Sequence, residues 1–384
     1  MTILVPRPWS AQPPRANRIK RGNYLLFDFL TFLLLVPAVA SAETRPVGLA
    51  VSFPNLSFQQ VLSKEEHAYL EVPSGKPFTF QEIRGELILV EFLSVYCVNC
   101  QRQAPVLNGL YAAIDQDKTL RGKIKIIGIA AGNNSREVER FKKEYNIAYP
   151  LMSDLRFDAH TAVGSPRTPF STWVRKERRG TGIVVSTHLG LMDSQETALK
   201  ETRAVLQYDL ALIKRQKGTI YKGDGLIPPL RKEDLLAKAR RGMEASGGRV
   251  LQIKKVPLKD GDWIYAGKVD FGTYQKSLFS KLASRRAVCD ICHDTFFIYT
   301  FDSEGKVVEI IPVQVTKNDN LDWTEEDVQK LRTRTVGRSI LQPFPFDPGV
   351  DSVSGATITS ALIFEALDKA KDIYTTLKKE RLID

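Results

Sequence analysis

The sequence is poor in residues that bind metals or cross-link a fold, with four cysteines and four histidines among 384 residues. All four cysteines lie in two Cys-x-x-Cys pairs, Cys97/Cys100 and Cys289/Cys292, so none remains to join distant parts of the chain. A disulfide within such a pair closes a loop too small to stabilise a fold much. The two pairs also lie too far apart for a zinc ribbon. We therefore predict redox chemistry at the cysteines and no metal site.

Long apolar runs are also scarce. Beyond residue 42, no run approaches the roughly 20 apolar residues of a membrane-spanning helix. The basic residues that give a net charge of +11 are scattered, and no recognised basic and aromatic module accompanies them. We expect a soluble body without a nucleic-acid partner, folded into two or three domains.

The N-terminus carries the pattern of an export signal. Four basic residues between positions 15 and 21 precede an apolar run at 25–39, which ends in Ala40-Ser41-Ala42. We predict that residues 1–42 are a signal peptide cleaved after Ala42, or an N-terminal membrane anchor if cleavage does not occur. The protein is then periplasmic or otherwise extracytoplasmic, where disulfides can persist.

Strands and helices alternate in the first half of the chain. Residues 86–94 and 123–130 are apolar enough to be buried strands, and residues 170–174 and 182–187 are a further pair. Helical spacing follows Cys100 and recurs at 136–145 and 194–214. This alternation predicts a mixed α/β sheet.

Residues 52–215 resemble a thioredoxin-like domain of the exported thiol-disulfide oxidoreductase branch. The resemblance is carried by Cys97 and Cys100, by Glu91 before them, by Pro105 in the following helix, and by Thr168-Pro169 before a strand. It implies a cis-Pro169 beside the active site, which offers a backbone edge to a protein thiol or disulfide substrate.

The placement of the two cysteines sets their expected roles. A helix N-terminus stabilises a thiolate, so Cys97 is the expected nucleophile. Cys100, one turn further along, resolves the mixed disulfide. A buried Glu91 has a raised pKa and is the candidate acceptor of the Cys100 proton, or an inert buried acid. Tyr96, where a tryptophan is usual, and the dipeptide Val98-Asn99 depart from the family and bear on redox potential and partner choice.

Residues 216–275 contain many glycines and prolines. We interpret them as a linker with lead-in elements, including an amphipathic helix near 232–243.

A turn of small residues precedes a long helical pattern near the C-terminus. We name residues 354–357 (Ser-Gly-Ala-Thr) the SGAT turn. Thr359 or Ser360 is the expected helix N-cap, which would place Thr357 at a helix N-terminus. Free N–H groups and the helix dipole make such a position suitable for a phosphate.

Residues 276–384 resemble an FMN-binding domain, and the resemblance implies an α+β fold. The matching positions of the flavinylation motif are Asp351, Ser354, Gly355, Ala356, Thr357 and Thr359. They imply that FMN is attached covalently through its phosphate to the Thr357 hydroxyl. Residues 316–320 depart from the Glu-Thr-Pro-Gly loop of many relatives, and a capped helix without flavin remains the alternative.

The second cysteine pair belongs to the string Cys289-Asp290-Ile291-Cys292-His293, which has the spacing of a c-type haem attachment site. Beyond Glu244 the chain has no methionine and no histidine except His293, so no local distal ligand is available. A second redox pair fits the rest of the chain better. Haem c and a local disulfide stay open.

Together these features predict an exported redox protein that exchanges thiols and disulfides through Cys97 and Cys100. FMN on Thr357 would couple this exchange to electron transfer, with a membrane redox partner as a candidate. One alternative is a flavin-free thiol-disulfide oxidoreductase, as in cytochrome maturation. Another is a non-enzymatic interaction module of a membrane redox complex.

Overall fold

The computed structural model describes residues 47–60, 62–177, 180–215, 226–258 and 262–383. The predicted signal peptide or anchor, residues 1–42, lies outside the described residues. The described residues all belong to one compact unit. Within the described ranges, no helix has the length and apolar character needed to cross a membrane.

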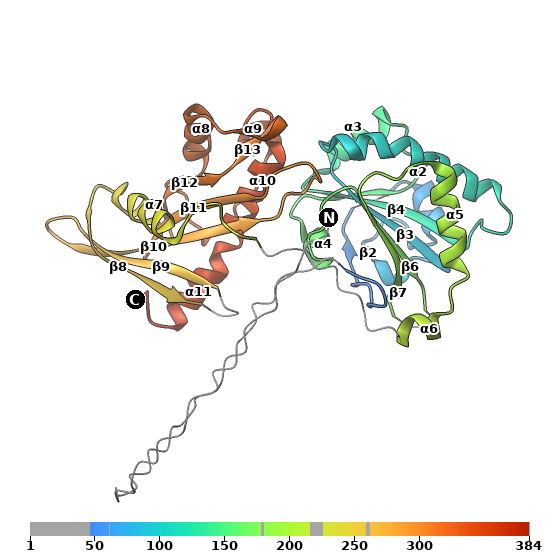
Figure 1. Cartoon of the computed structure of the whole chain (residues 1–384), viewed down its shortest axis with the longest axis horizontal. Coiled ribbons are helices and arrows are strands. Elements are labelled where there is room, and N and C mark those ends of the chain that lie inside the picture. The colour runs from blue at the N-terminus through green and yellow to red at the C-terminus, as the bar shows by residue number, and fades with distance from the viewer. Residues whose placement is uncertain (1–46, 61, 178–179, 216–225, 259–261, 384) are drawn as a thin grey trace, which may run out of the picture. The chain divides into compact units, whose positions relative to one another are not determined.

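The N-terminal part is built on one mixed five-stranded sheet, in the order β5-β4-β3-β6-β7 (Figure 1). β3 pairs in parallel with β4, and β4 with β5, whereas β6 and β7 are antiparallel. This sheet confirms the predicted α/β class and has a thioredoxin-like fold. The elements are β1 (Ser57–Phe58), α1 (Lys64–Leu70), β2 (Phe78–Thr79), η1 (Phe80–Glu82), β3 (Leu87–Leu93), α2 (Val98–Gln116), β4 (Ile124–Ala131), α3 (Ser135–Glu144), β5 (Leu151–Asp154), α4 (Asp158–Ala162), β6 (Phe170–Arg175), β7 (Ile183–Leu189), α5 (Gln195–Leu206) and α6 (Leu210–Arg215).

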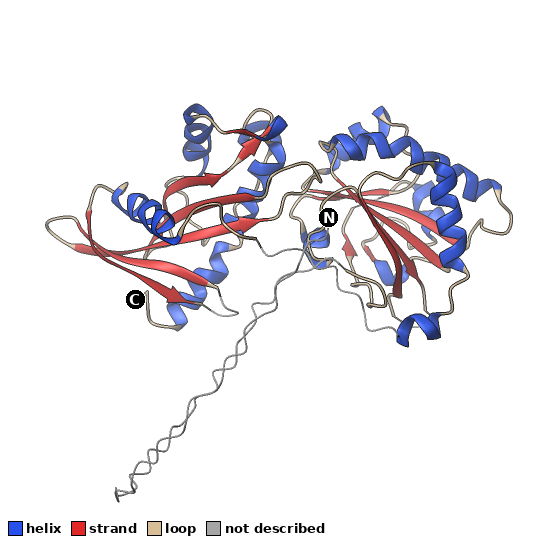
Figure 2. Cartoon of the chain, in the orientation of Figure 1, coloured by secondary structure: helices blue, strands red, loops and turns tan. Residues whose placement is uncertain are grey.

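The central strand β3 is buried on both faces along its whole length. Leu89 and Leu93 pack in a cluster that includes residues of α2 and α5, while Val90 and Phe92 pack in a second cluster on the other face. Helices cover both faces of the sheet, and α2 and α5 lie side by side (Figure 2). Because side chains alternate along a strand, Glu91 faces the same side as Leu89 and Leu93, toward α2.

The helix predicted at 194–214 is two helices, α5 and α6, separated by a short break. The Asp209 carboxylate accepts a hydrogen bond from the Ala211 N–H at 2.8 Å. This is N-terminal capping, which starts a new helix instead of continuing the first one.

The C-terminal part is built mainly on a five-stranded antiparallel sheet, in the order β12-β11-β10-β9-β8. One face packs against α7 and the other against α10 and α11. Its elements are α7 (Lys232–Glu244), β8 (Arg249–Pro257), β9 (Trp263–Asp270), β10 (Gln275–Arg285), β11 (Thr295–Asp302), β12 (Val307–Gln314), β13 (Thr316–Lys317), η3 (Asn318–Asn320), β14 (Leu321–Asp322), α8 (Glu325–Thr335), α9 (Pro348–Asp351), α10 (Thr357–Asp368) and α11 (Ala370–Lys379).

The boundary predicted at residue 276 falls inside β10. β8 and β9 belong to the same sheet, and α7 packs on it, so the predicted lead-in elements are part of the C-terminal core. β8 lies at the edge of the sheet, and only Val250 and Val256 of its nine residues are buried, which makes its pattern weak in the sequence.

Gly242 brings α7 close to β11. A Cβ atom at this position would lie 2.5 Å from the Thr300 hydroxyl, which is buried and bonded to Ser280. We expect Gly242→Ala to destabilise the protein by about 1–3 kcal/mol, because this overpacking outweighs the gain of roughly 1 kcal/mol in helix propensity. Chemical denaturation measures the change. Arg241→Ala, at an exposed neighbour, is the control and should stay near wild type. A stabilised Gly242→Ala protein would contradict this packing.

Candidate active site

Cys97 and Cys100 are free thiols at the start of α2, and both are buried, at 2% and 3% exposure. Cys97 is the N-cap residue, and its sulfur accepts a hydrogen bond from the Cys100 N–H at 3.3 Å. The Cys100 thiol and this N–H lower the pKa of the Cys97 thiol, although burial opposes them. The position at a helix N-terminus is therefore the one expected to favour a thiolate.

Cys100 has the opposite character. Burial, followed by its hydrogen bond to Cys97, raises the pKa of the Cys100 thiol well above its usual value. The pair thus contains one thiol that ionises readily and one that keeps its proton. This asymmetry matches the predicted roles of attacking and resolving cysteine.

The loop that faces Cys97 contains the Thr168–Pro169 peptide bond, which is cis. We name residues 167–169 the cis-proline loop. The Thr168 carbonyl oxygen accepts a hydrogen bond from the Cys97 thiol at 3.5 Å. The predicted neighbours Cys97 and Pro169 are thus brought together.

Glu91 lies beneath this site, only 1% exposed. Gln103 donates to one carboxyl oxygen at 2.6 Å, and the Ser171 hydroxyl donates to the other. Burial raises the pKa of Glu91 to about 8 against these hydrogen bonds. The carboxyl group is therefore protonated at neutral pH and becomes a proton acceptor only as the pH approaches 8.

In the second cysteine pair, Cys289 and Cys292 are joined as a disulfide, with their Cα atoms 5.3 Å apart. We name residues 287–294 the cysteine loop. Thioether bonds to haem would need both thiols, whereas this disulfide fits a redox pair or a local disulfide. His293 is exposed, and its backbone N–H donates to the Asn320 side chain at 2.9 Å. The described residues contain no cluster of three or more residues suited to a metal ion.

The SGAT turn leads into α10 one turn earlier than predicted. The helix begins at Thr357 with Ala356 as its N-cap, so the predicted caps Thr359 and Ser360 are wrong. Their hydroxyls are engaged elsewhere: Thr359 donates to the Thr316 carbonyl at 2.9 Å, and Ser360 accepts from the Val353 N–H at 3.0 Å.

The geometry of this turn suits the phosphate of FMN. No side chain caps α10, so its first N–H groups are free of a side-chain acceptor. Gly355 has a φ of 71°, which favours glycine, and together with Ser354 it is exposed. The buried Ser352 hydroxyl has no hydrogen-bond partner. Asp351 is buried and accepts from the Asp347 N–H, which holds the start of the turn.

Tyr96 joins the two predicted sites. Its hydroxyl interacts with the Thr357 side chain and donates a hydrogen bond to Glu137. Burial, reinforced by Glu137, raises the pKa of Tyr96. The residue directly before Cys97 therefore lies near the predicted flavin acceptor. In the sequence, the only sign of a special role for Tyr96 was that it stands where a tryptophan is usual.

Residues 316–320 connect the SGAT turn to the cysteine loop. The Asn318 N–H donates to the Gly355 carbonyl at 2.8 Å. The Asn320 side chain bonds the His293 N–H and the Ile291 carbonyl, both at 2.9 Å. The loop that departs from the Glu-Thr-Pro-Gly pattern of FMN-binding domains thus makes specific contacts with both motifs.

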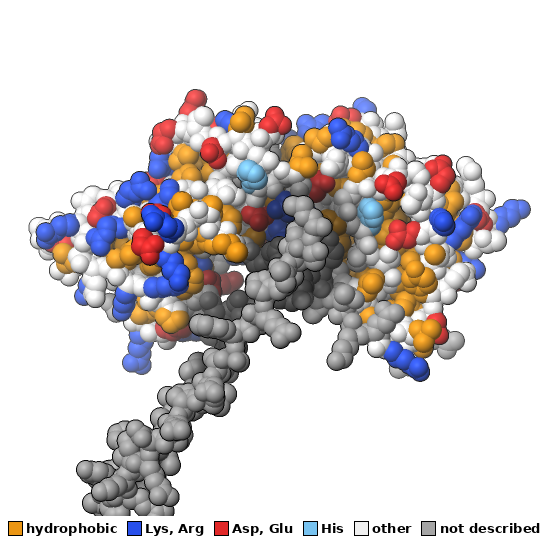
Figure 3. All heavy atoms as spheres, viewed as in Figure 1, with side chains coloured by type: hydrophobic (Ala, Val, Ile, Leu, Met, Phe, Trp, Pro, Cys, Tyr) orange, Lys and Arg blue, Asp and Glu red, His pale blue; other side chains and the backbone are white. Residues whose placement is uncertain are grey.

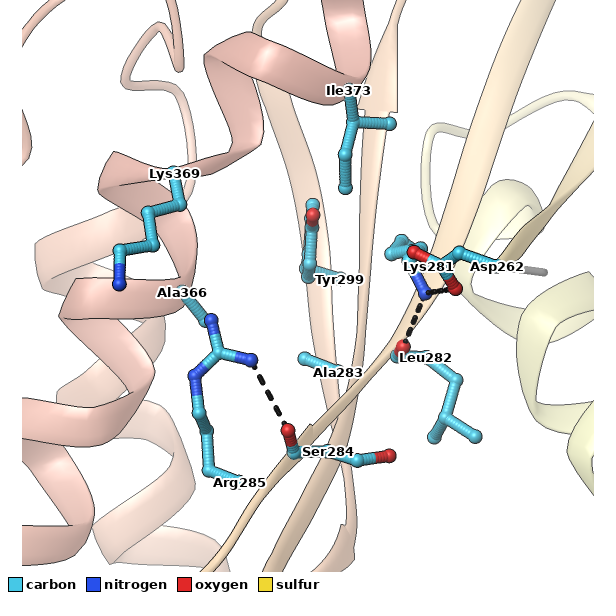
Figure 4. Close-up of a pocket in the computed structure, with 10 residues that line it drawn as sticks. All are labelled: Asp262, Lys281, Leu282, Ala283, Ser284, Arg285, Tyr299, Ala366, Lys369 and Ile373. Carbon is cyan, nitrogen blue, oxygen red and sulfur yellow. Dashed lines mark hydrogen bonds and ion pairs between the residues drawn. The ribbon is translucent and has the colours of Figure 1, made fainter. Parts of the chain in front are cut away.

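A hollow of about 330 Å³ lies between β10, β11 and the helices α10 and α11 (Figure 4). Lys281 is paired with Asp262 at 2.7 Å, and Arg285 with Glu365 at 2.6 Å. Lys369 also lines the hollow and shares the Glu365 carboxylate with Arg285, so each of the three cations has a carboxylate partner. The visible surface likewise mixes basic and acidic side chains (Figure 3), in keeping with the scattered charge of the sequence.

Parts of the chain are similar to known proteins. Residues 64–188 match the AhpC/TSA family. The thiol-disulfide oxidoreductase ResA of Halalkalibacterium halodurans is 25% identical over 162 residues, covering 42% of this chain and 87% of ResA. Protein DipZ of Mycobacterium tuberculosis is 26% identical over 98 residues, which cover 24% of this chain and 13% of DipZ. The crystal structure of StoA from Bacillus subtilis is 18% identical with a TM-score of 0.30, covering 39% of this chain and 98% of StoA.

The raised pKa of Glu91 makes stability depend on pH. Its folded pKa of about 8 lies above the ordinary value of 4.5, so its protonated form favours folding at low pH. This contribution is full below 4.5 and is lost as the pH rises through 8. We expect Glu91→Gln to lose less stability than wild type between about pH 5 and pH 8.5, by denaturant unfolding.

Glu86→Gln is the matched control, because Glu86 is exposed beside the same strand. Its pH profile should follow that of wild type. Parallel pH profiles of stability for wild type and Glu91→Gln would show that Glu91 does not have the raised pKa.

Proposed function

We propose that this protein is a thiol-disulfide oxidoreductase that acts through Cys97 and Cys100 on protein thiols or disulfides. The observation that supports this proposal most directly is the hydrogen-bonded cysteine pair at the start of α2. The pKa of Cys97 is lowered and that of Cys100 is raised. The similarity to ResA, a thiol-disulfide oxidoreductase, supports it. Cys97 attacks a substrate disulfide, and Cys100 then attacks Cys97 and releases the reduced substrate.

We further propose that FMN attached to Thr357 couples this exchange to electron transfer. Residues of the SGAT turn and the first N–H groups of α10 would hold the phosphate, and Ser352 offers an unpartnered hydroxyl nearby in sequence. FMN accepts electrons singly or in pairs, and can thus connect dithiol chemistry with one-electron carriers. The proximity of the Tyr96 hydroxyl to the Thr357 side chain supports the coupling, since Tyr96 directly precedes Cys97.

The export pattern of residues 15–42 supports an extracytoplasmic location, and a redox partner in the membrane is part of the proposal. A flavin-free oxidoreductase keeps the Cys97 chemistry and assigns the C-terminal part to binding. A non-enzymatic interaction module would lack both the thiol chemistry and the flavin. The two following experiments separate these alternatives.

Replacement of Cys97 tests the thiol chemistry. We expect Cys97→Ser to reduce a small model disulfide no faster than the added reductant alone, because the nucleophile is lost. Val98→Ser, at the exposed neighbouring residue, is the control and should retain catalysis. The rate of thiol release measures the effect. Equal rates for wild type and Cys97→Ser would exclude the proposed oxidoreductase activity.

Replacement of Thr357 tests the flavin site in protein made with a flavin transferase. We expect wild type to keep flavin fluorescence after denaturation and to show the FMN adduct by intact mass, and Thr357→Ala to lose both. Thr359→Ala is the matched control, because its hydroxyl is bonded to the Thr316 carbonyl and should not carry the adduct. A wild-type protein without adduct, or a Thr357→Ala protein that keeps it, would overturn the assignment.

A further inference from the structure

The cysteine loop occupies the backbone edge of the cis-proline loop. The Thr168 N–H donates to the Val288 carbonyl at 2.5 Å, and the Asp290 N–H donates to the Thr168 carbonyl at 3.1 Å. These two bonds form a parallel bridge that sets Cys289 opposite Thr168. The chain's own segment thus lies where an incoming thiol or disulfide peptide was expected to bind.

Two side chains of the thioredoxin-like part hold the cysteine loop there. The Arg167 guanidinium donates to the carbonyls of Cys289, Asp290 and Cys292 at 3.4, 3.3 and 2.6 Å. It also pairs with the Asp294 carboxylate at 3.0 Å. Asn99, which lies between the active-site cysteines, donates to the Asp290 carboxylate at 2.7 Å. One residue of the Cys97-x-x-Cys100 dipeptide therefore recognises the residue that follows Cys289.

Burial distinguishes the two sulfurs of the second pair. Cys289 is 5% exposed and belongs to the same apolar cluster as Cys97 and Cys100. Cys292 is partly exposed and packs at the edge of this cluster. Cys289 is accordingly the more buried sulfur of the second pair, and it shares the apolar cluster of Cys97.

We propose that the Cys289–Cys292 disulfide is a built-in exchange partner of the Cys97/Cys100 dithiol. This inference rests on the proposed thiol chemistry of Cys97 and names a partner for it.

The exchange proceeds in two steps. The Cys97 thiol first gives its proton to solvent, and the resulting thiolate attacks Cys289, which forms the Cys97–Cys289 bond and breaks the Cys289–Cys292 bond. Cys292 leaves as a thiolate and takes a proton from water. Cys100 then gives up its proton and attacks Cys97, and Cys289 leaves as a thiolate and is protonated. Two electrons and two protons have then moved from the first pair to the second, and the reverse sequence returns them.

Hydrogen bonds from residues 318–320 also link the second cysteine pair to the SGAT turn. Asn320 holds the cysteine loop, and Asn318, two residues earlier, holds the SGAT turn.

Because Cys97 is only 2% exposed, an external protein substrate must displace the cysteine loop before it reaches this sulfur. The internal disulfide therefore competes with external substrates for Cys97.

Two double variants of the full chain test which sulfurs can meet. Cys100→Ser/Cys292→Ser leaves Cys97 with Cys289, and Cys100→Ser/Cys289→Ser leaves Cys97 with Cys292. Each reduced protein is incubated with oxidised glutathione, quenched in acid, alkylated and mapped by mass spectrometry without reduction. We expect the Cys97–Cys289 bond to form at least about tenfold faster than Cys97–Cys292, at a rate independent of protein concentration. Equal rates, or faster pairing with Cys292, would overturn the assignment.

A second measurement keeps both Cys289 and Cys292, so its result does not depend on whether the double variants fold correctly. Fully reduced wild type and Cys97→Ser each receive one equivalent of oxidised glutathione, and differential alkylation follows the Cys289–Cys292 bond. We expect this bond to form at least about tenfold faster in wild type, because Cys97 passes the oxidation on. The same rate in both proteins would overturn the proposal.

The outcomes separate this inference from the proposed function. A wild-type protein that reduces the model disulfide through Cys97 but shows no Cys97-dependent oxidation of the second pair loses the internal exchange alone. A protein that forms Cys97–Cys289 rapidly but does not reduce the model disulfide loses the proposed external activity alone.

Discussion

The pairing of Thr168 with the backbone on either side of Cys289 is the interaction on which the redox region depends. A residue before a cis-proline offers an N–H and a carbonyl at an open edge, and such groups need partners when they are buried. Thr168 is fully buried, and Val288 and Asp290 supply those partners. The bridge fixes the second cysteine pair beside Cys97, and Arg167 and Asn99 reinforce it.

Burial also determines the protonation of the site. Cys97, Cys100 and Glu91 are all nearly inaccessible to water, so their pKa values depend on a few hydrogen bonds. Donors at a helix N-terminus favour the Cys97 thiolate, whereas Cys100 and Glu91 lack enough compensation and hold their protons.

Local patterns in the sequence sufficed for the elements that carry the site. The apolar run at 86–94 predicted β3, and the position of Cys97 predicted the N-terminus of α2. Contacts between residues far apart in the chain could not be predicted from local sequence patterns. No periodicity relates Thr168 to Cys289 or Tyr96 to Thr357, and β8 is too exposed to display a core pattern. The start of α10 was missed because Thr359 and Ser360 use their hydroxyls for tertiary bonds instead of capping.

The departures from the thioredoxin-like pattern acquire a physical meaning from these contacts. Tyr96 reaches Thr357, and Asn99 reaches Asp290, so both unusual residues beside Cys97 face the C-terminal part of the same chain. A segment tethered within one molecule has an effective concentration in the millimolar range or above. An external substrate must outcompete it, and so specificity at Cys97 depends on how readily the cysteine loop yields as much as on the shape of the substrate.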